Sequence, residues 1–187
     1  MDFKTLADQY RNELLDNVLP FWLEHSQDLE FGGYFTCLDR KGGVFDTDKF
    51  IWLQGREVWM FSMLYNKVEK RQEWLDCAVQ GGEFLKKYGH DGNYNWYFSL
   101  DRSGRPLVEP YNIFSYTFAT MAFGQLSLAT GNQEYADIAK KTFKIILSKV
   151  DNPKGKWNKL HPGTRNLKNF ALPMILCNLA LEIEHLL

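Results

Sequence analysis

A permanent positive charge stands within one of the most apolar stretches of the chain. Lys49 to Ser62 (KFIWLQGREVWMFS) predicts the first turns of a helix that is apolar on almost every side and therefore buried, yet it carries Arg56. A guanidinium does not lose its proton in a protein, and burying it alone is costly. Arg56 therefore either closes a structural ion pair, for example with Asp48, or faces a wet cavity. Spacing alone leaves both alternatives open.

Two neighbours of Arg56 could share such a cavity. Trp52 lies one helical turn before Arg56 and could stack on a sugar, whereas Gln54 lies on an adjacent face and could hydrogen-bond to it. The aromatic content of the whole chain is high, at 16%. An aromatic excess suits a carbohydrate cleft, but it also suits a bulky helical core.

Charge and hydropathy exclude two classes of partner. The net charge is −1 and no basic tract is present, which argues against nucleic-acid binding. The longest apolar run, Phe170 to Leu181, is too short to span a bilayer and is interrupted by Pro173 and Asn178. We therefore expect neither nucleic acid nor a membrane as a partner.

The cysteines and the N-terminus indicate a cellular compartment. Cys37, Cys77 and Cys177 are odd in number and widely spaced, as expected of reduced thiols rather than a disulfide framework. The first residues, MDFKTLADQYRNELL, are amphipathic and acidic and do not read as a signal peptide. Both observations favour a cytoplasmic protein.

Hydrophobic periodicity predicts helices of two kinds, joined by hairpins and loops. The amphipathic helices are expected from Phe3 to Pro20 or a few residues beyond, from Trp74 to Tyr88, and from Tyr135 to Ile146. The helices that are apolar on most sides are expected at Phe50–Val68, Ile113–Leu128 and Asn169–Leu186, the last with Pro173 in its first turn. Short β-hairpins are expected within 31–48 and 95–106, and a loop at 149–168.

This order repeats with a period of roughly sixty residues. Each repeat would pair an amphipathic helix with an apolar one, in segments of about 1–68, 70–129 and 133–187, and the first two inserts share letters (YFTCLDRKG and YFSLDRSG). An outer helix needs one apolar stripe, whereas an inner helix needs apolar residues all round. The alternation predicts an all-α fold, an α/α toroid, in which residues 1–187 form one domain.

Four segments in order resemble the N-acylglucosamine 2-epimerase family, in particular its renin-binding-protein branch. The pattern K-x-x-W-x-Q-x-R-x-x-W-x-F-S in 49–62 is similar to the family's N-terminal signature. FWLEHSQDLEFGGYF (21–35), IFSYTFATMAFGQLSLATGN (113–132) and LPMILCNLALEIE (172–184) resemble further segments. The resemblance implies an (α/α)6 barrel, of which three helix pairs are the N-terminal half. We expect either the first half of a longer protein or a half-barrel that must associate.

The resemblance implies an isomerase that interconverts N-acetylglucosamine and N-acetylmannosamine. A proton would leave C2 beside the open-chain aldehyde, and an enediolate would form before a proton returns to the other face. Arg56 matches an arginine that contacts substrate in the family, and it suits the cation beside the enediolate. The chemistry requires no metal and no redox cofactor.

The acid and base are expected to be missing from this chain. In the family they are histidines of the C-terminal half, and none of the histidines present here (His25, His90, His161 and His185) aligns with them. His25 is expected to bond to a hairpin carbonyl, and His90 and His185 to be solvated. We therefore expect the chain alone to be inactive.

Weaker expectations concern further ligands. Ser115 and Met174, on the second and third apolar helices, are candidate substrate contacts together with Trp52 and Gln54. Gly81-Gly82 resembles a stretch proposed to bind nucleotide in animal members that respond to ATP, so ATP is a candidate allosteric regulator. Glycines within a helix are better explained by close helix packing, because they offer no free N–H groups to a phosphate.

Other functions stay open at this point. A cellobiose 2-epimerase or a mannose-type isomerase would use the same fold. A non-catalytic carbohydrate-binding half-barrel would need no acid or base. A glycoside hydrolase would need two carboxylates across a cleft, and the available acids show no such arrangement (Asp28, Glu30, Asp39 and Asp48). The expected partner is a second copy in a homodimer, or a missing C-terminal half.

Overall fold

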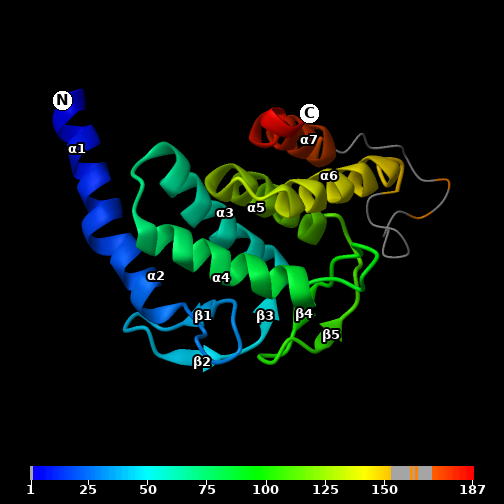
Figure 1. Ribbon diagram of the computed structural model, residues 1–187, viewed down its shortest axis with the longest axis horizontal. Coiled ribbons are helices and arrows are strands. Elements are labelled where there is room, and N and C mark those ends of the chain that lie inside the picture. The colour runs from blue at the N-terminus through cyan, green and yellow to red at the C-terminus, as the bar shows by residue number, and fades with distance from the viewer. Residues whose placement is uncertain (1, 153–160, 162, 164–169) are drawn as a thin grey trace.

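The computed structural model describes residues 2–152, 161, 163 and 170–187, so most of the loop predicted at 149–168 lies outside the described residues. Within these ranges the chain is mainly helical (Figure 1). The helices are α1 (Phe3–Glu13), a π-helical turn (Leu14–Val18), α2 (Leu19–His25), α3 (Ile51–Lys67), α4 (Gln72–Tyr88), α5 (Phe114–Thr130), α6 (Gln133–Ser148), α7 (Ala171–Glu182) and a final 3-10 turn (Glu184–Leu186). The predicted all-α fold is confirmed.

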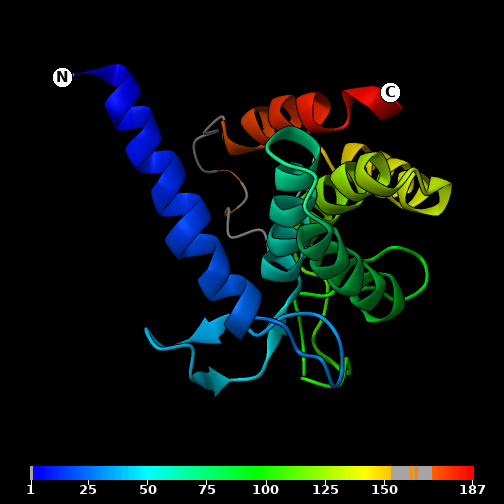
Figure 2. The same ribbon diagram turned by 60° about the vertical axis from the view of Figure 1, so that its left-hand side comes forward.

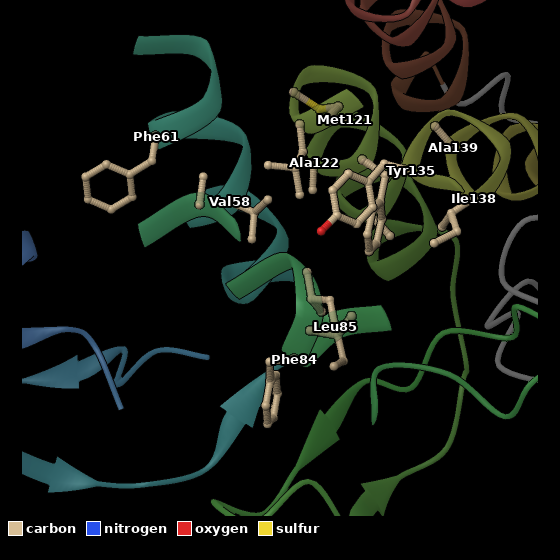
Figure 3. Packing of buried hydrophobic residues seen from close by; sticks show 14 of the residues in the cluster. Val58, Phe61, Phe84, Leu85, Met121, Ala122, Tyr135, Ile138 and Ala139 are labelled. Atoms are coloured by element: carbon tan, nitrogen blue, oxygen red, sulfur yellow. The ribbon is translucent and has the colours of Figure 1, made fainter. Parts of the chain in front are cut away.

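The helices differ in burial as predicted, and the difference follows their position. Helix α3 packs against both α4 and α5, and α5 packs in turn against α6. Helix α5 is buried along most of its length, whereas α6 buries one stripe that includes Tyr135, Ile138 and Ala139. Figure 3 shows this core, with Val58 of α3 and Ala122 of α5 between the two inner helices. The three-repeat division stays an interpretation of this element order.

Both predicted hairpins form, and a further strand pairs with the second one. In the first, β1 (Cys37–Leu38) pairs with β2 (Val44–Asp46); in the second, β4 (Ser99–Leu100) pairs with β5 (Pro106–Val108). The short strand β3 (Lys49–Phe50), expected as part of the apolar helix, instead pairs antiparallel with β4. This pairing links residues about fifty positions apart and holds the start of α3 against the second hairpin.

A buried cluster of charged side chains stabilises the same region around β3. Lys49 is fully buried, and its Nζ donates to the Asp28 carboxylate at 2.9 Å and to the carbonyls of Gly32 and Arg102 at 2.5 and 2.9 Å. Arg102 donates to Asp28 at 2.9 and 3.1 Å. Burial raises the pKa of Asp28, but the bonds from Arg102 and Lys49 outweigh it and lower that pKa to about 2. The cluster joins both inserts to the first residue of β3.

Close helix packing explains the paired glycines of α4. A Cβ on Gly81 would lie 2.2 Å from the Tyr34 hydroxyl, and one on Gly82 would lie 2.4 Å from a methyl carbon of Leu126. The glycines therefore allow α4 to lie against the first insert and against α5. Regulation by ATP stays a prediction.

The two ends of the helix array are its least covered parts. Helix α1 has no buried residue and stands clear of the other helices, while α7 buries only Leu179 (Figure 2). Large apolar side chains are exposed on both end helices: Phe3, Tyr10, Met174 and Leu181. Exposed apolar surface of this kind is typical of a binding face, as expected for half of a toroid.

We predict that Lys49→Met destabilises the chain by about 3–5 kcal/mol, because Asp28 would keep only Arg102 as a cationic partner and the carbonyls of Gly32 and Arg102 would lose their donor. Equilibrium urea unfolding at neutral pH measures the change. Arg105→Met is the control, because Arg105 is largely exposed and its ion pair with Asp101 contributes less than about 1 kcal/mol. Equal losses for the two variants would show that the buried cluster is not a stabilising centre.

Candidate active site

Arg56 opens onto a small hollow on one face of α3. The hollow has a volume of about 170 Å³. Helix α3 contributes residues spaced three and four apart, which α-helical geometry places on one face, while α2 and the first insert each contribute one residue. The lining residues are Leu53, Arg56, Glu57, Met60, Trp22 and Thr36.

The structure distinguishes between the two alternatives for Arg56. The guanidinium carbon lies 5.4 Å from the ring centre of Trp52 and 4.7 Å from that of Phe118, in cation–π contacts. The ion pairs of the described residues do not include Arg56. Arg56 is also exposed rather than buried. The ion-pair alternative is therefore wrong within the described residues, and the cavity alternative holds.

Asp48, the acid expected to pair with Arg56, lies in a different environment. Burial and the nearby carboxylates of Asp46 and Asp101 raise the pKa of Asp48. Such a carboxyl is surrounded by like charges and not by a guanidinium.

The predicted substrate contacts on α3 separate into two groups. Trp52 lies beside Arg56, and its ring is 6.2 Å from that of Phe118. Contact of Trp52 with a bound ligand stays a prediction. Gln54 is fully buried; its Nε2 donates to the Tyr34 carbonyl and its Oε1 accepts from the Tyr34 N–H, both at 2.8 Å. Gln54 therefore fixes the first insert against α3 and does not reach the hollow, which corrects the expectation that it binds substrate.

Ser115 and Met174 do not line the hollow. Ser115 is 3% exposed in the first turn of α5, and Met174 is 57% exposed on α7. The structure of the described residues does not bring these two side chains to the Arg56 hollow. Contact of either with a substrate would need a surface outside this hollow.

Glu57 is the functional candidate that the sequence analysis missed. It is 7% exposed, lines the hollow and hydrogen-bonds to Ser26 through Oε1. The Ser26 hydroxyl also donates to the Trp22 carbonyl at 2.6 Å. Ser26 is thus the donor to both the Trp22 carbonyl and the Glu57 carboxyl, and no cation pairs with Glu57 among the described residues. A buried carboxyl without a cationic partner favours its uncharged form.

Electrostatics agree with this assignment. Burial raises the pKa of Glu57 to about 8, with a smaller opposing effect from the bond to Ser26. A carboxyl with that pKa is mostly uncharged at pH 7. A Glu next to an Arg in an apolar helix was the available signal, but the sequence does not show that burial would keep Glu57 neutral.

A second polar group of the hollow lacks a partner. The Thr36 hydroxyl oxygen is buried and forms no hydrogen bond within the described residues. Buried hydroxyl groups are usually hydrogen-bonded to protein or to water. The hollow thus combines a cation, an uncharged acid, a hydroxyl and the Trp22 ring, a set that can recognise a polar ligand with an apolar face.

The histidines contribute nothing to this hollow. His90 is half-buried, stacks on Tyr94 with ring centres 4.7 Å apart and accepts from the Gly92 N–H at 3.0 Å. Nε2 of His185 lies 3.1 Å from the Gly124 carbonyl oxygen. The expectation of a solvated side chain is therefore wrong for the half-buried His90, whereas His185 is exposed as expected although it also contacts a carbonyl.

The remaining histidines also lie elsewhere. The His25 ring packs 4.9 Å from the Phe21 ring, and His161 is exposed. Within the ranges that the structure describes, no group of three or more His, Cys, Asp or Glu side chains is placed to hold a metal ion. In the same ranges, no helix has the length and apolar character needed to cross a membrane.

Comparison with known proteins identifies related sequences. A model of the family described as N-acylglucosamine 2-epimerase matches residues 33–185. The chain is 42% identical over 174 residues to the N-acylglucosamine 2-epimerase of Bos taurus, covering 90% of this chain and 41% of that protein. It is 29% identical over 168 residues to the cellobiose 2-epimerase of Dictyoglomus turgidum, covering 84% of this chain and 42% of that protein. The chain thus spans about two fifths of these relatives.

A solved structure supports the fold. The cellobiose 2-epimerase of Bacillus thermoamylovorans superposes with a TM-score of 0.81 at 24% identity, over 98% of this chain and 51% of that one. At this level of identity the likeness concerns the fold alone. The described helices therefore correspond to about half of a helical toroid of the epimerase type.

We predict that Glu57→Gln stabilises the chain, and increasingly so as pH rises. The unfolded carboxyl ionises near its ordinary pKa of 4.5, whereas the folded one holds its proton to about 8, so wild-type stability falls between these values. Glutamine removes this loss, with a gain of about 2–3 kcal/mol at pH 7 and little at pH 4.

Urea unfolding of both proteins across this pH range measures the effect. Glu24→Gln removes a carboxyl whose side chain is 76% exposed and should change stability by less than about 0.5 kcal/mol at every pH. A Glu57→Gln difference that stays constant with pH would mean that Glu57 is already ionised in the folded protein.

Proposed function

Since the chain belongs to the N-acylglucosamine 2-epimerase family, we propose that it forms the arginine-bearing half of a sugar 2-epimerase active site. The proposed substrates are N-acetylglucosamine and N-acetylmannosamine, and the reaction class is isomerisation. The observation that carries the proposal is Arg56, a permanent cation that opens onto a hollow and contacts aromatic rings instead of a carboxylate.

Inversion at C2 needs such a cation. Removing the C2 proton of the open-chain sugar places negative charge on the oxygen of the former aldehyde. A guanidinium fixed beside that oxygen stabilises the charge most strongly when no protein carboxylate competes for it. Trp22 offers an apolar wall to the sugar. The reaction exchanges only protons, so the proposal includes neither a metal nor a redox cofactor.

The groups that move the proton belong to the other part of the proposed site. This chain spans 41% of the bovine relative, and the described histidines do not line the Arg56 hollow. We propose that the remaining helices of the ring supply them, from a C-terminal half or from a second copy in a homodimer. The exposed faces of α1 and α7 are the proposed contact surfaces. A cytoplasmic location is part of the same proposal.

Two alternatives rest on specific observations. The likeness to cellobiose 2-epimerases supports action on a neutral disaccharide, but the identity is 29% against 42% for the amino-sugar epimerase. The absence of a histidine from the hollow, within the described residues, supports a carbohydrate-binding half-barrel without activity. Proton exchange separates these three functions.

We predict deuterium incorporation at C2 when N-acetylmannosamine is incubated in D2O with this chain joined to the remaining helices of the ring. The chain is tested alone and as a fusion to the part of the bovine relative that follows the matched region, with cooperative thermal unfolding as proof of folding. The fusion should produce C2-deuterated N-acetylglucosamine, and the chain alone should bind sugar without exchange. A folded fusion that binds N-acetylmannosamine but never exchanges its C2 proton would contradict the proposed function.

We predict that Arg56→Met lowers the exchange rate of the fusion by about 10²–10³-fold, as expected for loss of one oxyanion-stabilising group. Arg56→Lys keeps the charge but not the planar fork and should fall between Arg56→Met and wild type. Arg105→Met, which changes an exposed arginine, should exchange at the wild-type rate. Unchanged exchange in Arg56→Met would remove Arg56 from the mechanism.

A further inference from the structure

Arg56 and Glu57 face the same hollow although they are sequence neighbours of opposite nominal charge. No ion pair joins them, whereas the nearby Lys49–Asp28 contact shows that this fold closes buried ion pairs at 2.9 Å. Glu57 instead accepts a hydrogen bond from Ser26, the residue that follows α2, and it is 7% exposed without a cationic partner among the described residues, which favours the uncharged carboxyl. The hollow therefore holds one full positive charge and an acid that does not cancel it.

We propose that Glu57 determines the ligand specificity of the hollow: Arg56 accepts an anionic sugar oxygen only while burial keeps Glu57 as an uncharged carboxylic acid. The inference rests on the proposed function, because the ligand class is taken from it. It adds a role for Glu57, which acts on the ligand through the charge of the site.

The surroundings make Glu57 the group that changes charge near neutral pH. Tyr34 of the first insert and Cys77 of α4 both lie near Glu57, and burial raises the pKa of each well above its ordinary value. Both therefore stay neutral below about pH 9, and Arg56 stays positive. Next to α2, Ser26 does not titrate, and the preceding residue His25 is tested with its own variant.

Ionisation of Glu57 would place a negative charge in the same 170 Å³ hollow as Arg56. The carboxylate would attract the guanidinium and repel an incoming anion, and both effects oppose anion binding. With the pKa of Glu57 at about 8, the change falls between pH 7 and pH 9. A neutral sugar would be affected far less, so the ionisation state selects between ligands of different charge.

The test compares two open-chain probes on the full chain by titration calorimetry. 2-Acetamido-2-deoxygluconate carries a carboxylate at the position of the developing oxyanion, and 2-acetamido-2-deoxyglucitol is its neutral counterpart. The affinity of the wild-type chain for the gluconate should fall about tenfold from pH 7 to pH 9, and its affinity for the glucitol should change less than twofold. In Glu57→Gln, which mimics the protonated acid, the gluconate affinity should equal the wild-type value at pH 7 and stay constant to pH 9.

Two variants control for other titrating groups. Glu24→Gln removes an exposed carboxyl of α2, and His25→Gln removes the histidine beside Ser26; both should keep the wild-type fall in gluconate affinity. Ser26→Ala removes a hydroxyl that favours the charged carboxylate, so it should raise the pH at which affinity falls. Carbon NMR of labelled Glu57 should place its titration at the same pH as the loss of binding.

Three results would overturn the proposal: a Glu57→Gln chain with the wild-type pH dependence, a Glu57 carboxyl that titrates near pH 4.5, or no gluconate binding at pH 7. The proposed function fails separately. Proton exchange by the fusion without this pH dependence leaves the epimerase and removes the role of Glu57. A pH-dependent gluconate site in a protein that never exchanges the C2 proton would keep the role of Glu57 and remove the epimerase function.

Discussion

The constraint on which this half-barrel depends is that Arg56 keeps its full charge at an exposed position of the mostly apolar helix α3. The same fold shows the opposite solution a few residues away, where Lys49 is buried against Asp28 and two carbonyl oxygens. The ammonium group of Lys49 already donates to three acceptors, so its role is structural. Arg56 contacts the faces of Trp52 and Phe118, which attract a cation but do not neutralise it. The positive charge of Arg56 can therefore attract an anion into the hollow.

The surrounding architecture serves this arrangement in two ways. The Lys49 cluster and the β3–β4 pairing fix the start of α3, so Arg56 has a set position in the second turn of that helix. The burial of Glu57 keeps the neighbouring acid protonated and outweighs the opposing bond from Ser26, so the hollow is not neutralised from within. The structural cation Lys49 and the functional cation Arg56 therefore lie on adjacent elements, β3 and α3, but differ in their partners.

The sequence predicted the positions of the helices well, and for α3 to α6 the periodicity also indicated their burial, whereas α1 and α7 are largely uncovered. The apolar stretch 51–67 and the striped α6 were both recognisable from residue spacing alone. Long-range partners were not, since periodicity indicates a buried face but not which group meets it. Gln54 bonds to Tyr34, twenty residues away, and Glu57 to Ser26, thirty-one away. Arg56 was identified because a fixed charge in an apolar helix is anomalous in any context, whereas the state of Glu57 depends on burial that only the fold reveals.

A crystal structure of the chain with 2-acetamido-2-deoxygluconate near pH 6.5 tests the central claim most directly, because it shows which anion the Arg56 guanidinium prefers. The account predicts the sugar carboxylate in the hollow, with two parallel hydrogen bonds from Arg56, and Glu57 still bonded to Ser26. A guanidinium that is paired with a protein carboxylate, with the sugar acid bound elsewhere or not at all, would contradict it.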